Sequence, residues 1–393
     1  MTANVAQPQD ESPVLFEERP AGSFRIGIAT LNAPRTLNGL SLDMARLLNE
    51  RLAKWADDPA IALVVLQGAG EKAFCAGGDL HGLYRSMQAY REGGHADVRE
   101  NRYASEFFEV EYRLDYRIHT YAKPIVCWGH GIVMGGGMGL MAGASHRVVT
   151  ERSRLAFPEI TVGLYPDVGG SWLLHRVPLR GGLFLALTGA PLNAGDAIYA
   201  NMADIQIASD QRDAVLAALA AANWSEDAGD NAKAVDNVLA GFASPAAPGP
   251  LQAHQASIAA VVASDSLDAI VEGILGMEGD DPWLATARET LAAGAPGSAR
   301  LAYELQRRAA DLSLADVFRL EYIASLHCAA HGDFMEGIRA LLIDKDRQPR
   351  WRPATLADAS SDWADTFFQL TWDAAGHPLA DLGVTTHSGA KPQ

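Results

Sequence analysis

The chain has 393 residues, of which 48% are hydrophobic and 20% are charged, and its formal net charge is −16. This length allows two domains or one large core with an appendage, and the composition predicts a well-packed globular protein instead of a disordered chain. The negative charge repels nucleic-acid phosphates and anionic lipid surfaces, which argues against nucleic acid and membranes as partners.

The start of the chain, residues 1–13, is expected to be loose. It lacks the basic and apolar segments of a secretory leader and the arginines of a transit peptide. No uninterrupted apolar run of membrane-spanning length follows. The three cysteines, Cys75, Cys127 and Cys328, are widely spaced and favour a reducing compartment, so we expect a cytoplasmic protein.

The first part of the chain alternates strand-like and helical segments. Residues 24–32 alternate as a strand, residues 42–58 form an amphipathic helix capped by Ser41, and residues 61–70 are a short apolar run typical of a buried parallel strand. The pattern recurs over residues 105–150, as a polar helix, the strand PIVCWGHGIVM, a row of glycines, a short helix and the strand HRVVT. These segments predict an α/β core over residues 14–202.

The second part of the chain is different in character. From about residue 203 strand-like runs become rare, and alanine-rich sequence typical of helices follows, interrupted by a Pro/Ala/Gly-rich loop at residues 239–252. Residues 203–393 are therefore expected to form a mostly helical C-terminal region. No internal repeat and no heptad pattern is visible in the sequence.

Two glycine rows, CAGGD at residues 75–79 and MGGGMG at residues 134–139, each follow an apolar strand and open a helix. Residues 137–142 fit the loose dinucleotide fingerprint, with Glu151 as a candidate ribose-binding acid. Too few residues lead from the glycines to the next strand for a crossover helix, however, because such a unit needs roughly 30 residues. No Gly-Lys-Ser/Thr follows either row, which excludes a P-loop.

Two further explanations of the glycine rows stay open at this stage. Both rows could be tight turns that only let elements pack closely. Alternatively, two free backbone N–H groups at helix N-termini could form an oxyanion hole, which stabilises negative charge on a reacting carbonyl oxygen.

Three segments then carry a resemblance: KAFCAGGDL, KPIVCWGHGIVMGGGMGL and FPEITVGLYPDVGGSWLL are similar to the crotonase (enoyl-CoA hydratase/isomerase) superfamily across about residues 14–205. Within it, EYRLDYRIHTYAKP, PEITVGLYPDVGG and GDFMEGIRALLIDKDRQPRWRP resemble the 3-hydroxyisobutyryl-CoA hydrolase branch over most of the chain. The resemblance implies an α/β fold built as a spiral of ββα units. It also implies an acyl-CoA substrate and an oxyanion hole made by the amides of Gly78 and Gly136.

The acidic residues point to the reaction within this family. Hydratases of the superfamily carry a second glutamate where this chain has Gly139, whereas the glutamate of the P-E motif is kept as Glu159. Hydration needs both a base for water and a proton source for the α-carbon, so losing one acid argues against a proficient hydratase. The resemblance to the hydrolase branch assigns function to Glu159, Asp167 and Glu111.

In this reading Glu159 attacks the thioester carbonyl directly, giving an anhydride, or deprotonates a water, and the sequence leaves both routes open. Asp167 would orient Glu159 or the water, or bind the substrate hydroxyl, and Glu111 would hydrogen-bond the acyl 3-hydroxyl. Without the resemblance each acid has a plainer explanation: a solvated helix face for Glu111, turn chemistry for Asp167 and a first-turn acid for Glu159. Asp79 is predicted to cap the helix that follows it.

No metal site is predicted, because the histidines are scattered and no Cys/His cluster occurs. Cys75 and Cys127 are expected in the core, and His130 and His146 are expected to be structural. No separate cofactor is expected, since CoA is part of the substrate, and Arg35 and Lys72 are the candidates to meet its phosphates. The resemblance allows a homo-oligomer.

The predicted function is hydrolysis of a short 3-hydroxyacyl-CoA thioester, with 3-hydroxyisobutyryl-CoA as the favoured substrate in a step of valine degradation. The alternatives are an enoyl-CoA hydratase or isomerase with a rearranged acid pair, a non-catalytic acyl-CoA-binding protein and, last, a dinucleotide-binding oxidoreductase.

Overall fold

The computed structural model describes residues 12–369, 373 and 375–384 of the chain. Within this part, Ser12 and Pro13 are tied to the core, because their carbonyl oxygens accept hydrogen bonds from the side chain and the backbone amide of Asn32. The rest of the predicted loose start lies outside the described residues.

A six-stranded sheet forms the centre of the molecule, in the order β1 (Val14–Ala21), β2 (Phe24–Leu31), β3 (Ile61–Gly68), β5 (Ile125–Gly129), β7 (His146–Val149) and β9 (Ile205–Gln206). The β1/β2 pair is antiparallel and all other pairs are parallel. Strand β1 was not predicted. Its sequence, VLFEERPA, breaks the apolar alternation, and only its two ends are buried.

A smaller parallel sheet of β4 (Ala73–Cys75), β6 (Ile132–Met134) and β8 (Arg154–Ala156) lies beside the first. The prediction of one strand over residues 124–134 is wrong, because the chain turns between β5 and β6. Gly131 has φ +58° there, and a Cβ at this position would overlap the carbonyl of Lys72. The three successive pairs β3/β4, β5/β6 and β7/β8 each add one strand to the large sheet and one to the small sheet before a helix follows, which confirms the predicted spiral of ββα units.

The core helices are α1 (Leu42–Asp57), α2 (Leu80–Glu92), α3 (Arg102–His119), α4 (Gly136–Ala142), α5 (Gly170–His175), α6 (Gly181–Thr188) and α7 (Ala194–Tyr199). The predicted cap of α1 is confirmed, since Ser41 Oγ accepts a hydrogen bond from the amide of Met44. Helix α1 buries Met44, Leu48, Leu52 and Trp55, which recur every three or four residues and line one face.

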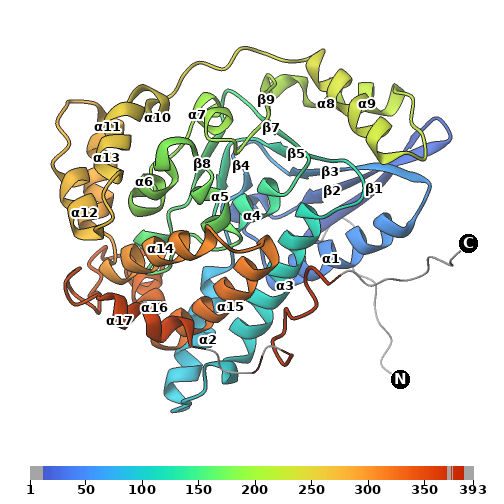
Figure 1. The fold of residues 1–393 in the computed structure, drawn as a ribbon. Helices are drawn as coiled ribbons and strands as arrows, with labels where there is room; N and C mark the ends of the chain where they lie inside the picture. Colours follow the sequence, from blue (N-terminus) through green and yellow to red (C-terminus); the bar gives the residue numbers. More distant parts are fainter. Residues whose placement is uncertain (1–11, 370–372, 374, 385–393) are drawn as a thin grey trace, which may run out of the picture.

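Helices cover both faces of the large sheet (Figure 1). On one face α8 (Arg212–Ala221) and α9 (Ala228–Ala240) pack Val215, Leu219 and Val235 against strand residues such as Val65 and Val126. On the other face lie α1 and α3, which belong to the main apolar cluster of the molecule. The large sheet is therefore buried on both sides, as expected for mostly parallel strands.

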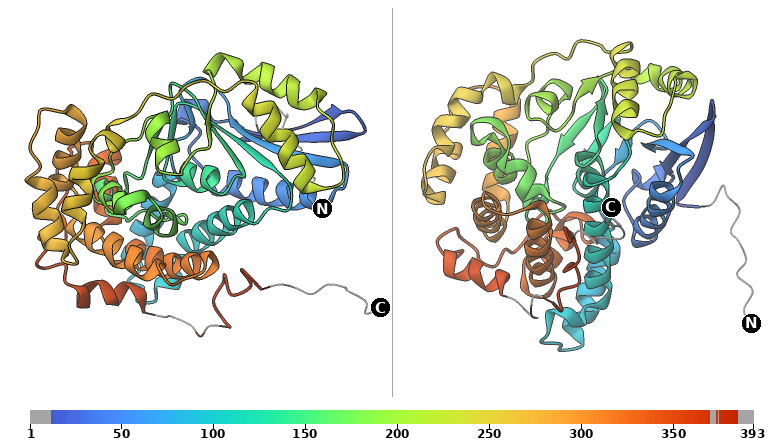
Figure 2. Two further views of the ribbon diagram at one scale, coloured as in Figure 1. Left: turned by 45° about the horizontal axis from the view of Figure 1, so that its top comes forward. Right: turned by 45° about the vertical axis from the view of Figure 1, so that its right-hand side comes forward.

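The predicted helical C-terminal region contains α10 (Pro250–Ala253), α11 (Gln255–Val262), α12 (Leu267–Leu275), α13 (Pro282–Ala293), α14 (Pro296–Ala309), α15 (Leu314–His331), α16 (Phe334–Ile338), a π-helical turn (Arg339–Ile343) and α17 (Ser361–Asp365). Helix α14 packs against α5 and α6, and α15 packs against α3 (Figures 1 and 2). The C-terminal region thus folds back onto the core.

None of the helices in the described residues is both long and apolar enough to cross a membrane.

Candidate active site

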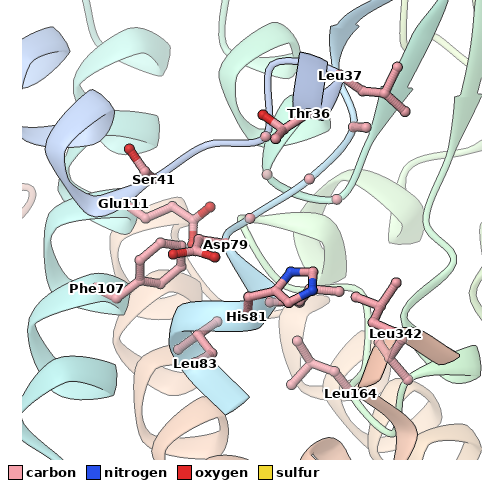
Figure 3. Close-up of a pocket in the computed structure, with 18 of the residues that line it drawn as sticks. Thr36, Leu37, Ser41, Asp79, His81, Leu83, Phe107, Glu111, Leu164 and Leu342 are labelled. Atoms are coloured by element: carbon pink, nitrogen blue, oxygen red, sulfur yellow. The ribbon is translucent and has the colours of Figure 1, made fainter. Parts of the chain in front are cut away.

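A cavity of about 710 Å³ lies between the core and the C-terminal region. This volume is in the range of small-molecule sites. Its walls come from the segment after β2, both glycine rows, α3 and the segment after β8, and from Phe334, Leu341 and Leu342 of the C-terminal region. Phe107 and Glu111 project from α3 on one side, with Leu164 and Leu342 opposite (Figure 3).

The two glycine rows meet at this cavity. Gly78 follows β4 and Gly136 opens α4, and a Cβ built on Gly136 would lie 3.5 Å from the amide nitrogen of Gly78. Both residues line the cavity. Among the hydrogen bonds of the described residues, none uses either amide as its donor. Two N–H groups without an acceptor among the described residues therefore line the same cavity.

The dinucleotide reading of the second glycine row is wrong. Its glycines serve close packing, because a Cβ on Gly137 would overlap the carbonyl oxygen of Cys75 in the neighbouring strand β4. Glu151, the candidate ribose ligand, instead accepts hydrogen bonds from the amide and hydroxyl of Ser209, at 2.9 and 2.5 Å. It is not among the residues that line the cavity.

Glu159 opens the 3₁₀ turn η4 (Glu159–Thr161) shortly after β8, and the residue is 5% exposed. A Cβ built on Gly135 would lie 3.1 Å from Glu159 Oε1, which places this carboxyl beside the second glycine row. Its Oε2 is buried and has no hydrogen-bond partner among the described residues. Burial raises the pKa of Glu159 well above its ordinary value, and the nearby Asp167 carboxyl adds to the rise.

Without the resemblance, the sequence around Glu111 would indicate a solvated helix face, but in the structure Glu111 is buried. The residue is 2% exposed, and its Oε1 would lie 2.5 Å from a Cβ on Gly136, so the carboxyl lies beside the second glycine row on the α3 side. Burial, and then the charge of Asp167, raise the pKa of Glu111 well above its usual range.

Asp167 lies where the loop after η4 enters α5. Its Oδ2 is 2.7 Å from the hydroxyl of Tyr112, and its backbone carbonyl accepts a hydrogen bond from Gly170. The next residue, Val168, has φ +53°, which is costly for a β-branched side chain and marks a tightly constrained turn. Burial raises the pKa of Asp167 to about 6, although a hydrogen bond that Tyr112 can donate to the ionised carboxylate opposes the rise.

Arg35 and Lys72 are placed differently by the structure. Arg35 is exposed and lines the cavity, in the short turn after β2. Lys72 is exposed but is not among the lining residues, and its backbone carbonyl accepts a hydrogen bond from Ile132. Asp79 is confirmed as the cap of α2, because its Oδ1 accepts from the amide of Gly82 at 2.9 Å.

The expected structural roles of the cysteines and histidines agree with the structure. Cys75 and Cys127 are buried in the core, and burial raises the pKa of the Cys75 thiol to about 12. His130 Nε2 is bonded to the carbonyl of Gly70, and His146 lies 3.3 Å from Asp236. In the described part of the chain, no group of three or more His, Cys, Asp or Glu side chains is arranged to hold a metal ion.

Sequence reasoning missed Asp115, one helical turn after Glu111 on α3. It is fully buried, both carboxyl oxygens lack a partner among the described residues, and burial and the charge of Glu111 raise its pKa well above the ordinary value. A Cβ on Gly139 would lie 2.6 Å from Asp115 Oδ2 and 2.8 Å from Val168 Cβ. The i, i+4 spacing of the two acids in EYRLD was the signal that could have found it.

The crowding around Gly139 makes a testable prediction. Gly139→Ala should lower the free energy of unfolding by about 1 to 3 kcal/mol, because the new methyl group overpacks against two side chains that cannot withdraw. Urea unfolding measures the loss. Gly241→Ala, at an exposed position with ordinary backbone angles after α9, is the control and should change stability by less than about 0.5 kcal/mol. Equal stability of both variants would contradict the packing.

Asp115 predicts a pH dependence. The pKa of Asp115 is raised in the folded state. Below its unfolded pKa of about 3.9, the folded and the unfolded protein both hold the proton, so the ionisation of Asp115 does not affect the free energy of unfolding. As the pH rises, the unfolded state loses this proton first and is increasingly favoured. The stability of Asp115→Asn relative to the unchanged protein should therefore improve steadily between about pH 4 and pH 8. A pH-independent difference in urea unfolding would show that Asp115 is not held neutral.

Comparison with known proteins identifies the family to which this fold and cavity belong. Residues 26–368 match the family model described as Enoyl-CoA hydratase/isomerase, and the chain belongs to this family.

Curated relatives and solved structures match over most of their length. A zebrafish (Danio rerio) protein named 3-hydroxyisobutyryl-CoA hydrolase, mitochondrial, is 39% identical over 91% of this chain and 89% of its own. The human protein of the same name is 32% identical, over 87% and 86%. A crystal structure described as a carnitinyl-CoA dehydratase from Mycobacterium thermoresistibile is 36% identical, with a TM-score of 0.79 over 92% of this chain and 97% of that one. One described as an enoyl-CoA hydratase from Rhodobacter sphaeroides is 34% identical, with a TM-score of 0.78 over 92% and 98%.

Proposed function

We propose that this protein hydrolyses a short 3-hydroxyacyl-CoA thioester, with 3-hydroxyisobutyryl-CoA giving 3-hydroxyisobutyrate and CoA. The observation that carries the proposal is the pair of free amides at Gly78 and Gly136, flanked by Glu111 and Glu159, with glycine instead of glutamate at position 139. The names of the relatives support the same substrate.

In the proposed reaction, the thioester oxygen accepts hydrogen bonds from the amides of Gly78 and Gly136. Attack on the carbonyl carbon turns this oxygen into an oxyanion, and each preorganised donor then stabilises the transition state by about 3 kcal/mol. Water supplies the new oxygen of the acid, the carbon–sulfur bond breaks, and CoA leaves as its thiolate. Because glycine lets both backbones approach, no side chain intrudes on the place of the oxyanion.

Glu159 is the proposed catalytic carboxylate. It lies beside the second glycine row with one free oxygen, so it can attack the carbonyl carbon to give an anhydride, or take a proton from an attacking water. Its raised pKa makes it a stronger base once it is ionised. Both routes use the same carboxylate at the same carbon.

Glu111 and Asp167 are proposed to select the acyl group. Both residues line the cavity, and Glu111 Oε1 lies beside Gly136, where a 3-hydroxyl could donate to it. Asp167 would bind this hydroxyl as well, or orient Glu159. The nucleotide phosphates would be met by Arg35 at the cavity wall, and Lys72 would have to contact them outside the cavity.

The proposal includes the wider predictions from the sequence. CoA enters as part of the substrate, so no separate cofactor is used, and the acid product belongs to valine degradation. The three free, buried cysteines support a reducing compartment such as the cytoplasm, whereas the vertebrate relatives are named as mitochondrial. A homo-oligomer stays a prediction.

Hydration of an enoyl-CoA is the second candidate, since the two solved structures above are described as a dehydratase and a hydratase. Two assays separate the candidates. The purified protein is mixed with 3-hydroxyisobutyryl-CoA while free thiol is followed, and with crotonyl-CoA while the enoyl absorbance is followed. Thiol release without loss of enoyl absorbance is expected. Absorbance loss alone would favour the hydratase, and binding without either change would favour an acyl-CoA-binding protein.

A further inference from the structure

A buried row of oxygen atoms leads from Asp167 away from the cavity. Asp167 Oδ2 lies 2.7 Å from the Tyr112 hydroxyl, which lies 2.7 Å from Ser325 Oγ. Ser325 Oγ lies 2.8 Å from the Tyr165 hydroxyl, and this hydroxyl lies 2.7 Å from the backbone carbonyl oxygen of Glu321. The row joins α3, the loop after η4 and helix α15, which pack together (Figure 1). We call these four contacts the oxygen relay.

Counting protons along the oxygen relay gives an unexpected result. Four contacts each need one hydrogen between two oxygens, and the hydroxyls of Tyr112, Ser325 and Tyr165 supply three. The carbonyl of Glu321 supplies none. If Asp167 is ionised, one of the four contacts therefore has no hydrogen between its two oxygens, and their lone pairs repel each other at hydrogen-bonding distance. If Asp167 is protonated, it donates to Tyr112, and each hydroxyl donates onward to the next oxygen until Tyr165 donates to the carbonyl.

The surroundings of Asp167 contain more carboxyl groups than can be ionised together. The titratable groups that face it are Glu111, Tyr112 and Asp115 from α3, Glu159 from η4, Tyr165 from the loop, and Glu321 and Cys328 from α15. Among the ion pairs of the described residues, none includes any of the five carboxyls in this cluster. Carboxylates this close cannot all ionise without a cation, so some must stay neutral.

We propose that Tyr112, Ser325 and Tyr165 act as positioning residues that stabilise the protonated form of Asp167 and thereby lower the negative charge beside Glu159. This inference rests on the proposed function in assigning Glu159 as the reactive carboxylate. The relay thereby shifts Asp167 toward its neutral form, and a less charged Asp167 lets the neighbouring Glu159 ionise more easily.

Ser325→Ala tests the proposal, because the sign of the effect is distinctive. When Asp167 is ionised, one contact to Ser325 has no hydrogen, and this unfavourable contact disappears with the Ser325 hydroxyl. When Asp167 is protonated, the loss of Ser325 leaves the Tyr112 hydroxyl without an acceptor. Asp167 should then lose its proton about one pH unit lower than in the unchanged protein. Infrared difference titration of the carboxylic acid C=O band follows this proton, with Asp167→Asn to assign the band.

Two further measurements complete the test. Tyr165→Phe should also lower the pH at which Asp167 loses half of its protons, but by a smaller amount. The Ser325 hydroxyl remains in this variant and can donate to the carbonyl of Glu321 in place of Tyr165. In the thiol-release assay, the acid limb of kcat/KM, which reports Glu159, should move to higher pH in Ser325→Ala, since an ionised Asp167 repels the Glu159 carboxylate. A merely structural Ser325 would lower stability without moving either midpoint.

An unchanged or raised Asp167 midpoint in Ser325→Ala would overturn the proposal. Such a result would mean that the hydroxyls only donate toward an ionised carboxylate. The infrared titration needs no turnover, so a protein that releases no thiol would contradict the proposed hydrolysis while leaving the relay open to measurement.

Discussion

Glu159→Gln is expected to slow thiol release by about 10³-fold, the largest effect of any single substitution considered. The amide keeps the shape of the side chain but can neither attack the thioester carbonyl nor take a proton from water. Steady-state thiol release at saturating substrate measures the loss in kcat. KM should change little, because Glu159 is one of many residues that line the cavity.

The same variant should be at least as stable as the unchanged protein, which separates lost chemistry from lost folding. The pKa of Glu159 is raised in the folded state, so its ionisation opposes folding at every pH above its unfolded value of about 4.3. The melting temperature of Glu159→Gln should therefore match or exceed that of the unchanged protein at about pH 8. Near-normal turnover would refute the central role of Glu159.

Gly136→Ala is expected to lower kcat by about 10²- to 10³-fold, the cost of losing one oxyanion donor. The added methyl group would lie 2.5 Å from Glu111 Oε1 and 3.5 Å from the amide nitrogen of Gly78, where the thioester oxygen is proposed to bind. Steady-state kinetics with thermal melting measures the effect. Full activity in a folded Gly136→Ala protein would mean that the oxyanion binds elsewhere.

Much of the fold was predictable from local patterns. The cap at Ser41, the buried parallel strand that follows α1 and the helical C-terminal region all left periodic or capping signals in the sequence. Strand β1 and the break between β5 and β6 did not. The first is polar along most of its length, and the second depends on Gly131 packing against the carbonyl of Lys72, a contact between distant parts of the chain.

The site was predictable where a motif carried it. Gly78, Gly136, Glu159, Asp167 and Glu111 all line one cavity, as the resemblance implied. The far end of the oxygen relay was not predictable, because Ser325 and Glu321 lie on α15, more than 150 residues away from Tyr165, in sequence with no distinctive pattern. Long-range contacts of this kind leave no local pattern.

The most direct measurement of the central claim is the initial rate of thiol release from 3-hydroxyisobutyryl-CoA by four proteins side by side: the unchanged chain, Glu159→Gln, Gly136→Ala and the remote control Gly241→Ala. Rapid release by the unchanged chain and the control is expected, with losses of at least about 10²-fold in the other two proteins. No release by the unchanged chain, or similar rates in all four folded proteins, would contradict this claim.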